Sequence, residues 1–160
     1  EEEDGAEALM AGDPAAAVRE LVERIARALG FDGPVDVEDH GDELVATLHG
    51  DELGLFIGRH GQTIDAVQHL AFRAALDAGL EDKRVTVDAE GYRARRREAL
   101  EHQAEQAAAD AIRFGRPVAL DAMTATERKL VHEFLRDRGD VDTHSEGEEP
   151  DRHLVVAPRG

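Results

Sequence analysis

The fold of this chain is decided by the stretch Leu53-Gly54-Leu55-Phe56-Ile57-Gly58-Arg59-His60-Gly61. Two glycines bracket an arginine and a histidine, and a residue without a Cβ lets another backbone approach closely. Apolar residues at helical spacing over 64–74 predict a helix directly behind this loop. A helix start offers N–H groups and a positive dipole end, so the loop suits a sugar-phosphate backbone. A tight turn in which the glycines only satisfy geometry is the other interpretation.

The segments before and after the loop predict a small α+β domain over residues 13–90. An amphipathic helix is expected over 14–29, where Asp13 and Pro14 supply the N-cap and the first helical position. Alternating residues predict a hairpin of two strands before the loop and a third strand around 84–88. Residues 1–12 are acidic and small, which indicates a disordered tail.

The last third of the chain predicts a second small domain over residues 117–160. A long polar helix is expected from about Tyr92 to Arg113, and residues 91–116 are interpreted as a connector between the two domains. A capping box at Thr124-Ala125-Thr126-Glu127 opens another helix. Short strands are expected around residues 118–120, 141–143 and 154–156.

The helix behind the capping box carries basic side chains on one face. Arg128 and His132 are four residues apart, and Arg136 continues the line. On a helical wheel they are separate from the apolar face of Leu130, Val131, Phe134 and Leu135, so the basic stripe is expected off the core. An ordinary solvated face would show the same pattern.

Both halves resemble known nucleic-acid-binding domains. The order helix, strand, strand, Ile-Gly-x-x-Gly, helix, strand over residues 14–90 resembles a KH domain of the type II arrangement. Two further stretches resemble the Arg–His (R-x-x-x-H) domain: Met123-Thr124-Ala125-Thr126-Glu127-Arg128-Lys129-Leu130-Val131-His132 and Val141-Asp142-Thr143-His144-Ser145-Glu146-Gly147-Glu148-Glu149-Pro150-Asp151-Arg152. This pairing, in this order, resembles the bacterial Jag family (SpoIIIJ-associated, also called KhpB or EloR).

The resemblance implies a fold, a function and a set of contact residues. The fold is α+β in two small domains, each a three-stranded sheet packed by helices, joined by a long helix. The function is binding of single-stranded RNA, or single-stranded DNA, in a post-transcriptional regulator linked to cell-envelope growth or division. A small stand-alone KH protein is the implied partner. The implied RNA-binding residues are Ile57, Gly58, Arg59, His60, Gly61, Ile64, Arg128, His132, Arg136 and Arg152, although core packing explains Ile57 and Ile64 as well.

Composition limits the classes of function. The chain has no cysteine and no apolar run long enough for a membrane span, which favours a cytoplasmic protein without a thiolate metal site. No metal spacing stands out among the 8 histidines, so neither catalysis nor a cofactor is expected. A metal-dependent phosphodiesterase is the enzymatic rival.

The net charge of -17 argues against a nucleic-acid partner at first sight. The acids are concentrated upstream, however: residues 1–54 carry a net charge of -13, whereas residues 55–117 carry 10 acids and 10 bases. The arginines of the predicted long helix, Arg93, Arg95, Arg96 and Arg97, either extend an RNA path or pair with nearby acids. A protein–protein adaptor with weak RNA binding is the alternative function.

Overall fold

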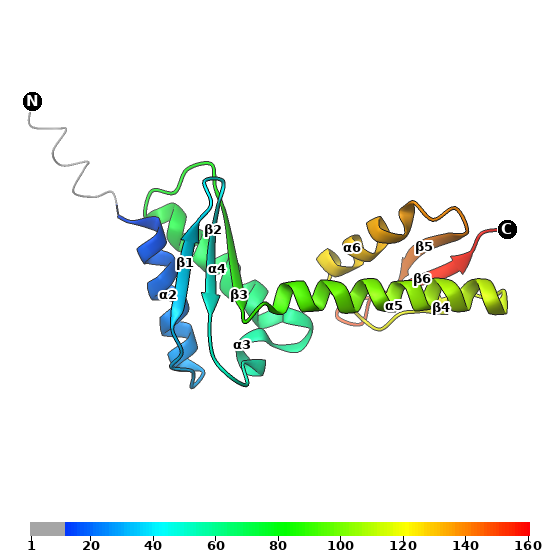
Figure 1. The fold of residues 1–160 in the computed structure, drawn as a ribbon, viewed down its shortest axis with the longest axis horizontal. Coiled ribbons are helices and arrows are strands. Elements are labelled where there is room, and N and C mark those ends of the chain that lie inside the picture. Colours follow the sequence, from blue (N-terminus) through cyan, green and yellow to red (C-terminus); the bar gives the residue numbers. More distant parts are fainter. Residues whose placement is uncertain (1–11) are drawn as a thin grey trace, which may run out of the picture. The chain divides into compact units, whose positions relative to one another are not determined.

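The computed structural model describes residues 12–160, which form two compact units, the first ending at Arg93 and the second comprising residues 94–160 (Figure 1). Each unit has its own three-stranded sheet and its own hydrophobic core, so the predicted α+β class is confirmed. The predicted acidic tail lies outside the described residues, apart from Gly12. None of the helices within residues 12–160 combines the length and apolar composition needed to cross a membrane.

Over residues 12–91 the first unit has three strands, three α-helices and a short 3-10 turn. In chain order they are α2 (Pro14–Ala28), β1 (Val35–Asp39), β2 (Glu43–Leu48), α3 (Gly54–Ile57), η1 (Arg59–Gly61), α4 (Gln62–Asp77) and β3 (Arg84–Ala89). The sheet order is β1-β2-β3, with β1 antiparallel and β3 parallel to β2. The predicted hairpin is therefore confirmed, and β3 returns to the sheet after α4 has crossed over.

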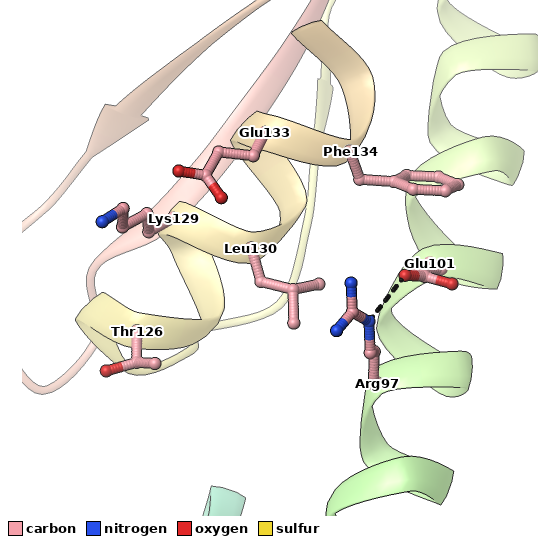
Figure 2. Close-up of a pocket in the computed structure, with 7 residues that line it drawn as sticks. All are labelled: Arg97, Glu101, Thr126, Lys129, Leu130, Glu133 and Phe134. Carbon is pink, nitrogen blue, oxygen red and sulfur yellow. Dashed lines mark hydrogen bonds and ion pairs between the residues drawn. The ribbon is translucent and has the colours of Figure 1, made fainter. Parts of the chain in front are cut away.

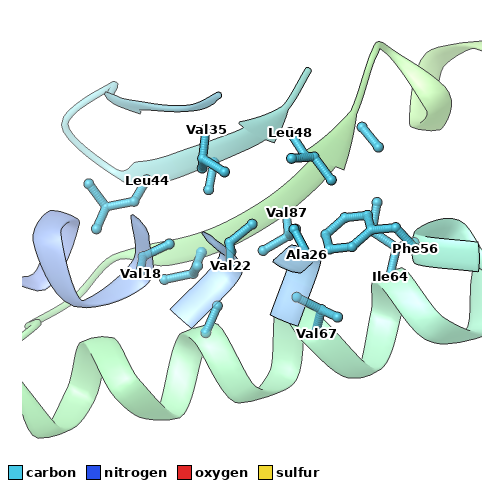
Figure 3. Packing of buried hydrophobic residues seen from close by; sticks show 14 of the residues in the cluster. Val18, Val22, Ala26, Val35, Leu44, Leu48, Phe56, Ile64, Val67 and Val87 are labelled. Atoms are coloured by element: carbon cyan, nitrogen blue, oxygen red, sulfur yellow. The ribbon is translucent and has the colours of Figure 1, made fainter. Parts of the chain in front are cut away.

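The core of the first unit lies between the sheet and the helices α2 and α4 (Figure 3). Alternation along β2 places Leu44, Ala46 and Leu48 on the inner face, where all three are buried. From the loop side, Phe56 and Ile64 complete the cluster with no exposed surface. The glycine loop therefore begins and ends on buried anchors, which hold its backbone in one position.

The second unit contains most of one long helix, a second helix and three strands. They are α5 (Tyr92–Phe114), β4 (Val118–Ala119), α6 (Ala125–Arg136), β5 (Val141–Glu146) and β6 (His153–Pro158). The sheet order is β4-β6-β5, and both pairs are antiparallel. From Ala94 onward α5 belongs to this unit, and it buries a face of one leucine and four alanines in its core: Leu100, Ala104, Ala107, Ala108 and Ala111.

The start of α6 has the predicted capping box. The Thr124 hydroxyl accepts from the Glu127 N–H at 3.3 Å, and the Glu127 carboxylate accepts from the Thr124 N–H at 3.1 Å. The same carboxylate accepts from Arg96 Nε of α5 at 2.7 Å. Because Glu127 serves both the cap and the ion pair, it ties the first turn of α6 to α5.

Candidate nucleic-acid interface

The glycine loop is a left-handed connection between α3 and α4. Gly58, His60 and Gly61 have φ values of 76°, 56° and 77°, a region that glycine enters without steric cost. No side chain caps the N-terminus of α4. The Gln62 N–H donates to the Arg59 carbonyl within the 3-10 turn. The N–H groups that follow it in the first turn have no side-chain partner at the cap, and a helix N-terminus of this kind favours an anion.

Space as well as conformation requires glycine at position 58, and a Cβ at position 61 would meet a tight contact. A Cβ on Gly58 would lie 2.2 Å from the Thr63 hydroxyl oxygen and 2.8 Å from the Thr63 backbone nitrogen. A Cβ on Gly61 would lie 3.0 Å from the Tyr92 hydroxyl oxygen. The loop is thus pressed against α4 on one side and the start of α5 on the other, and it is preformed rather than flexible.

The electrostatic surroundings of the loop favour an anion despite the acidic chain. Residues 53–64 contain no acid, which makes this the longest acid-free stretch of the sequence. Arg59 is exposed, and its Nε donates to His60 Nε2 at 3.3 Å. The first acid of α4, Asp65, accepts from Arg93 Nη1 at 3.0 Å, so its charge is neutralised within the fold.

The two isoleucines proposed to border an RNA groove differ in exposure. Ile57 is half-buried and packs against the core, so part of its side chain faces outward. Ile64 has no exposed surface and belongs to the core. In this structure Ile64 acts as an anchor for α4 and offers a ligand no contact surface.

The expectation that Arg128 lies off the core face is wrong. Arg128 is only 8% exposed, and α6 buries it together with Val131 and Leu135. Its Nη1 donates to the Met123 carbonyl at 2.5 Å and its Nη2 to the Glu149 carboxylate. Burial is tolerated because the guanidinium finds its acceptors in the loops before α6 and before β6.

His132 and Arg136 are exposed on α6, as the helical spacing predicts. His132 Nδ1 is hydrogen-bonded to the Thr143 hydroxyl of β5, which holds the imidazole over the edge of the sheet. Sequence reasoning did not single out Thr143. The sequence pattern that could have identified Thr143 is the alternation of β5, which places Val141, Thr143 and Ser145 on the face toward α6.

Arg152 lies next to Arg128 but is engaged with backbone. Its Nη1 donates to the Gly147 carbonyl at 2.6 Å, and its own carbonyl accepts from Arg128 Nη1 at 3.4 Å. Arg128 and Arg152 therefore close the acidic turn between β5 and β6 from its two sides. The two arginines act here as positioning residues for that turn.

Other basic side chains are paired within the fold. Arg93 also donates to the Val87 carbonyl and to Gln68, which ties α4 to β3, and Arg97 pairs with Glu101 at 3.0 Å. In the second unit, hydrogen bonds from Arg138 and Arg159 hold the pKa of the Asp140 and Asp142 carboxyls below the usual 3.8. These carboxyls stay ionised at neutral pH and offset the charge of both arginines.

A groove of about 420 Å³ lies between α5 and α6 (Figure 2). Leu130 and Phe134 give it an apolar floor, and charged side chains of both signs surround that floor. Arg97, one of the arginines that the sequence singles out on the long helix, lines it, whereas none of the residues implied to bind RNA does. Among residues 12–160, the His, Asp and Glu side chains form no group of three or more that could hold a metal ion.

The two units match two known domain families in the order in which they occur. A family model described as the KH domain of KhpA/KhpB matches residues 16–88. A second family model, that of the R-x-x-x-H domain, matches residues 98–158, and it is the Arg–His domain of the resemblance described above. The chain thus contains a KH domain followed by an Arg–His domain.

Relatives over most of the chain identify the family. A protein of Clostridium symbiosum is 35% identical over 140 residues, one of Lactiplantibacillus plantarum 41% over 137, and one of Bacillus subtilis 31% over 147. The matches cover 86%, 84% and 91% of this chain, and 63%, 42% and 71% of the respective relatives. All three are named RNA-binding protein KhpB. The chain belongs to the KhpB (Jag) family, and it spans 63% and 42% of the first two relatives' lengths.

Proposed function

We propose that this chain binds single-stranded RNA and that the Gly58–Gly61 loop contacts the RNA backbone. The observation that carries the proposal is the preformed loop at the N-terminus of α4, which no side chain caps, within the longest acid-free stretch of the chain. The names of the relatives support RNA as the ligand. In KH domains a loop of this kind clamps about four nucleotides of backbone.

On this proposal α6 supplies a second contact through His132 and Arg136. Both side chains are exposed, and Thr143 orients the imidazole. Arg128 and Arg152 act through the turn that they hold rather than by touching RNA. The chain is proposed to be a binding protein, not an enzyme, and a turnover assay on single-stranded RNA with divalent metal ions tests that statement.

Crosslinking the full chain to RNA, followed by sequencing of the bound RNA, tests the proposed function directly. Crosslinks at residues 57–61 and along α6 are expected. Absence of crosslinked RNA, together with no binding of oligoribonucleotides in solution, would favour the protein–protein adaptor. Regulation linked to cell-envelope growth and pairing with a stand-alone KH protein stay predictions from the family resemblance.

The salt dependence of RNA affinity is expected to be shallow. Many basic side chains are paired within the fold, so few phosphates are neutralised and few counterions are released. The slope of log affinity on log salt is about 0.7 per neutralised phosphate of a single strand, and we expect about two to five phosphates' worth. Fluorescence anisotropy titrations across a range of potassium chloride concentrations measure it. A slope near zero would contradict a phosphate contact at the loop.

Replacing His132 with alanine is expected to weaken RNA binding without changing stability. The imidazole is exposed and its hydrogen bond is to a hydroxyl at the sheet edge, so the free energy of unfolding should change by no more than about 0.5 kcal/mol. Loss of one contact to the ligand should lower affinity about five-fold or more. Thr143→Val is the companion variant: it keeps the imidazole but removes its orienting partner, and should give a smaller loss. Equal affinity of the parent and His132→Ala would remove His132 from the interface.

A further inference from the structure

The C-terminal end of α5 carries an aromatic ring that the second core leaves exposed. Phe114 is the last residue of α5, and 54% of its surface is accessible to solvent. The chain has only five phenylalanines, and the other four are buried or half-buried. Because an apolar ring is stabilised by removal from water, an exposed ring in a chain so poor in aromatics suggests a surface that another molecule covers.

Two guanidinium groups flank this ring. The Arg113 Cζ lies 5.2 Å and the Arg116 Cζ 5.6 Å from the ring centroid, both within cation–π range. Arg113 comes from the last helical turn. Gly115, with φ 63°, reverses the chain, and the Arg116 N–H donates to the Ala111 carbonyl at 3.3 Å. The helix ending therefore brings the second arginine back to the ring.

The charge around the ring is positive, in contrast to the chain as a whole. Residues 111–120 contain these two arginines and no acid, between Asp110 and Asp121. Within residues 12–160 neither guanidinium forms an ion pair with a carboxylate, so both are available to pair with an external anion. Basic side chains also favour a helix C-terminus, but this effect explains the arginines without explaining the exposed ring.

We propose that Phe114, with Arg113 and Arg116, is a stacking site for one nucleobase of single-stranded RNA, and that the two guanidinium groups contact its neighbouring phosphates. Single strands are bound in this way because every base offers a π-face and every link carries a charge. The inference rests on the proposed function, and it adds a contact that neither the glycine loop nor α6 supplies.

Affinity measurements on the full chain test the stacking contact. Phe114→Leu keeps an apolar side chain but removes the ring, and it should weaken binding of a labelled oligouridine about five- to 150-fold. The matched control is Ile112→Ala, an exposed apolar side chain (44%) in the same turn of α5, which should leave affinity unchanged. An abasic oligomer of the same length has no base to stack, so the parent and Phe114→Leu should bind it equally.

A fluorescence measurement reports the contact itself. The chain has no tryptophan, so Phe114→Trp would carry the single indole of the protein. Oligouridine should quench its emission in parallel with the rise in anisotropy of the labelled RNA. Anisotropy that rises with no change in indole emission would overturn the proposal, as would equal affinity of the parent and Phe114→Leu. If the parent chain itself binds no oligouridine, the proposed function fails, and the stacking site fails with it.

Discussion

Replacing Arg59 and His60 together with aspartate is expected to lower the affinity for single-stranded RNA at least about tenfold, because two donors of charged hydrogen bonds become anions facing phosphate. Stability should be preserved. Aspartate is among the side chains that tolerate the left-handed conformation of residue 60, and acids beside the N-terminus of α4 interact favourably with its dipole. Anisotropy titration and thermal melting of the same preparation measure the two effects separately.

A matched control distinguishes a local contact from the general effect of added negative charge. Ala16→Asp with Arg19→Asp changes the net charge by the same amount, since histidine is counted as neutral, on exposed positions of α2. This control should lose little affinity, because charges farther apart than about 8 Å are largely screened at physiological salt. Equal losses in both double variants would contradict a phosphate contact at the loop.

Replacing Arg128 with alanine is expected to lower the free energy of unfolding of the second unit by about 2–3 kcal/mol, because loss of the buried guanidinium leaves three hydrogen-bond acceptors without their donor. For a unit of this size the melting temperature should fall by roughly 10–20 °C. The acceptors are the carbonyls of Met123 and Arg152 and the carboxylate of Glu149. Hydrogen exchange within residues 94–160 should rise first near the turn between β5 and β6.

Two further variants identify the cause of that loss. Arg128→Lys keeps the charge but lacks the fork that reaches several acceptors, so it should recover only part of the stability. Arg136→Ala, exposed on the same helix, should change the free energy of unfolding by no more than about 0.5 kcal/mol. If Arg128→Ala melts like the parent but its folded form no longer binds RNA, Arg128 is a ligand contact and its positioning role is wrong.

Most of the elements could be predicted from the sequence because their signals are local. Asp13 caps α2, the alternation of β2 buries one face of the strand, and the capping box of Thr124 and Glu127 opens α6. The glycines at 58 and 61 predict a tight loop that a backbone can approach closely, and the structure gives both a positive φ. In each case the residues that determine the local structure lie within a few positions of one another, so the sequence alone indicates it.

The roles of the long basic side chains could not be predicted from the sequence, because their partners lie on segments that come together only in the folded chain. Periodicity placed Arg128 off the core face, but whether a guanidinium can be buried depends on its acceptors, and Glu149 lies 21 positions along the chain. Arg93 likewise donates to Asp65 in the first turn of α4, 28 positions away. The residues next to a lysine or arginine in the sequence do not indicate which acceptor its long side chain will reach in the fold.

The sequence by itself determined that this protein has two α+β domains and that a glycine loop stands at the start of a helix. Only the tertiary structure decided which cations stay available for a ligand. Folding sequesters Arg93 and Arg128, whereas it leaves Arg59 and Arg136 exposed and brings Arg113 and Arg116 to the ring of Phe114. The physical reason is that burial and pairing depend on which surfaces pack together, and packing is a property of the whole unit.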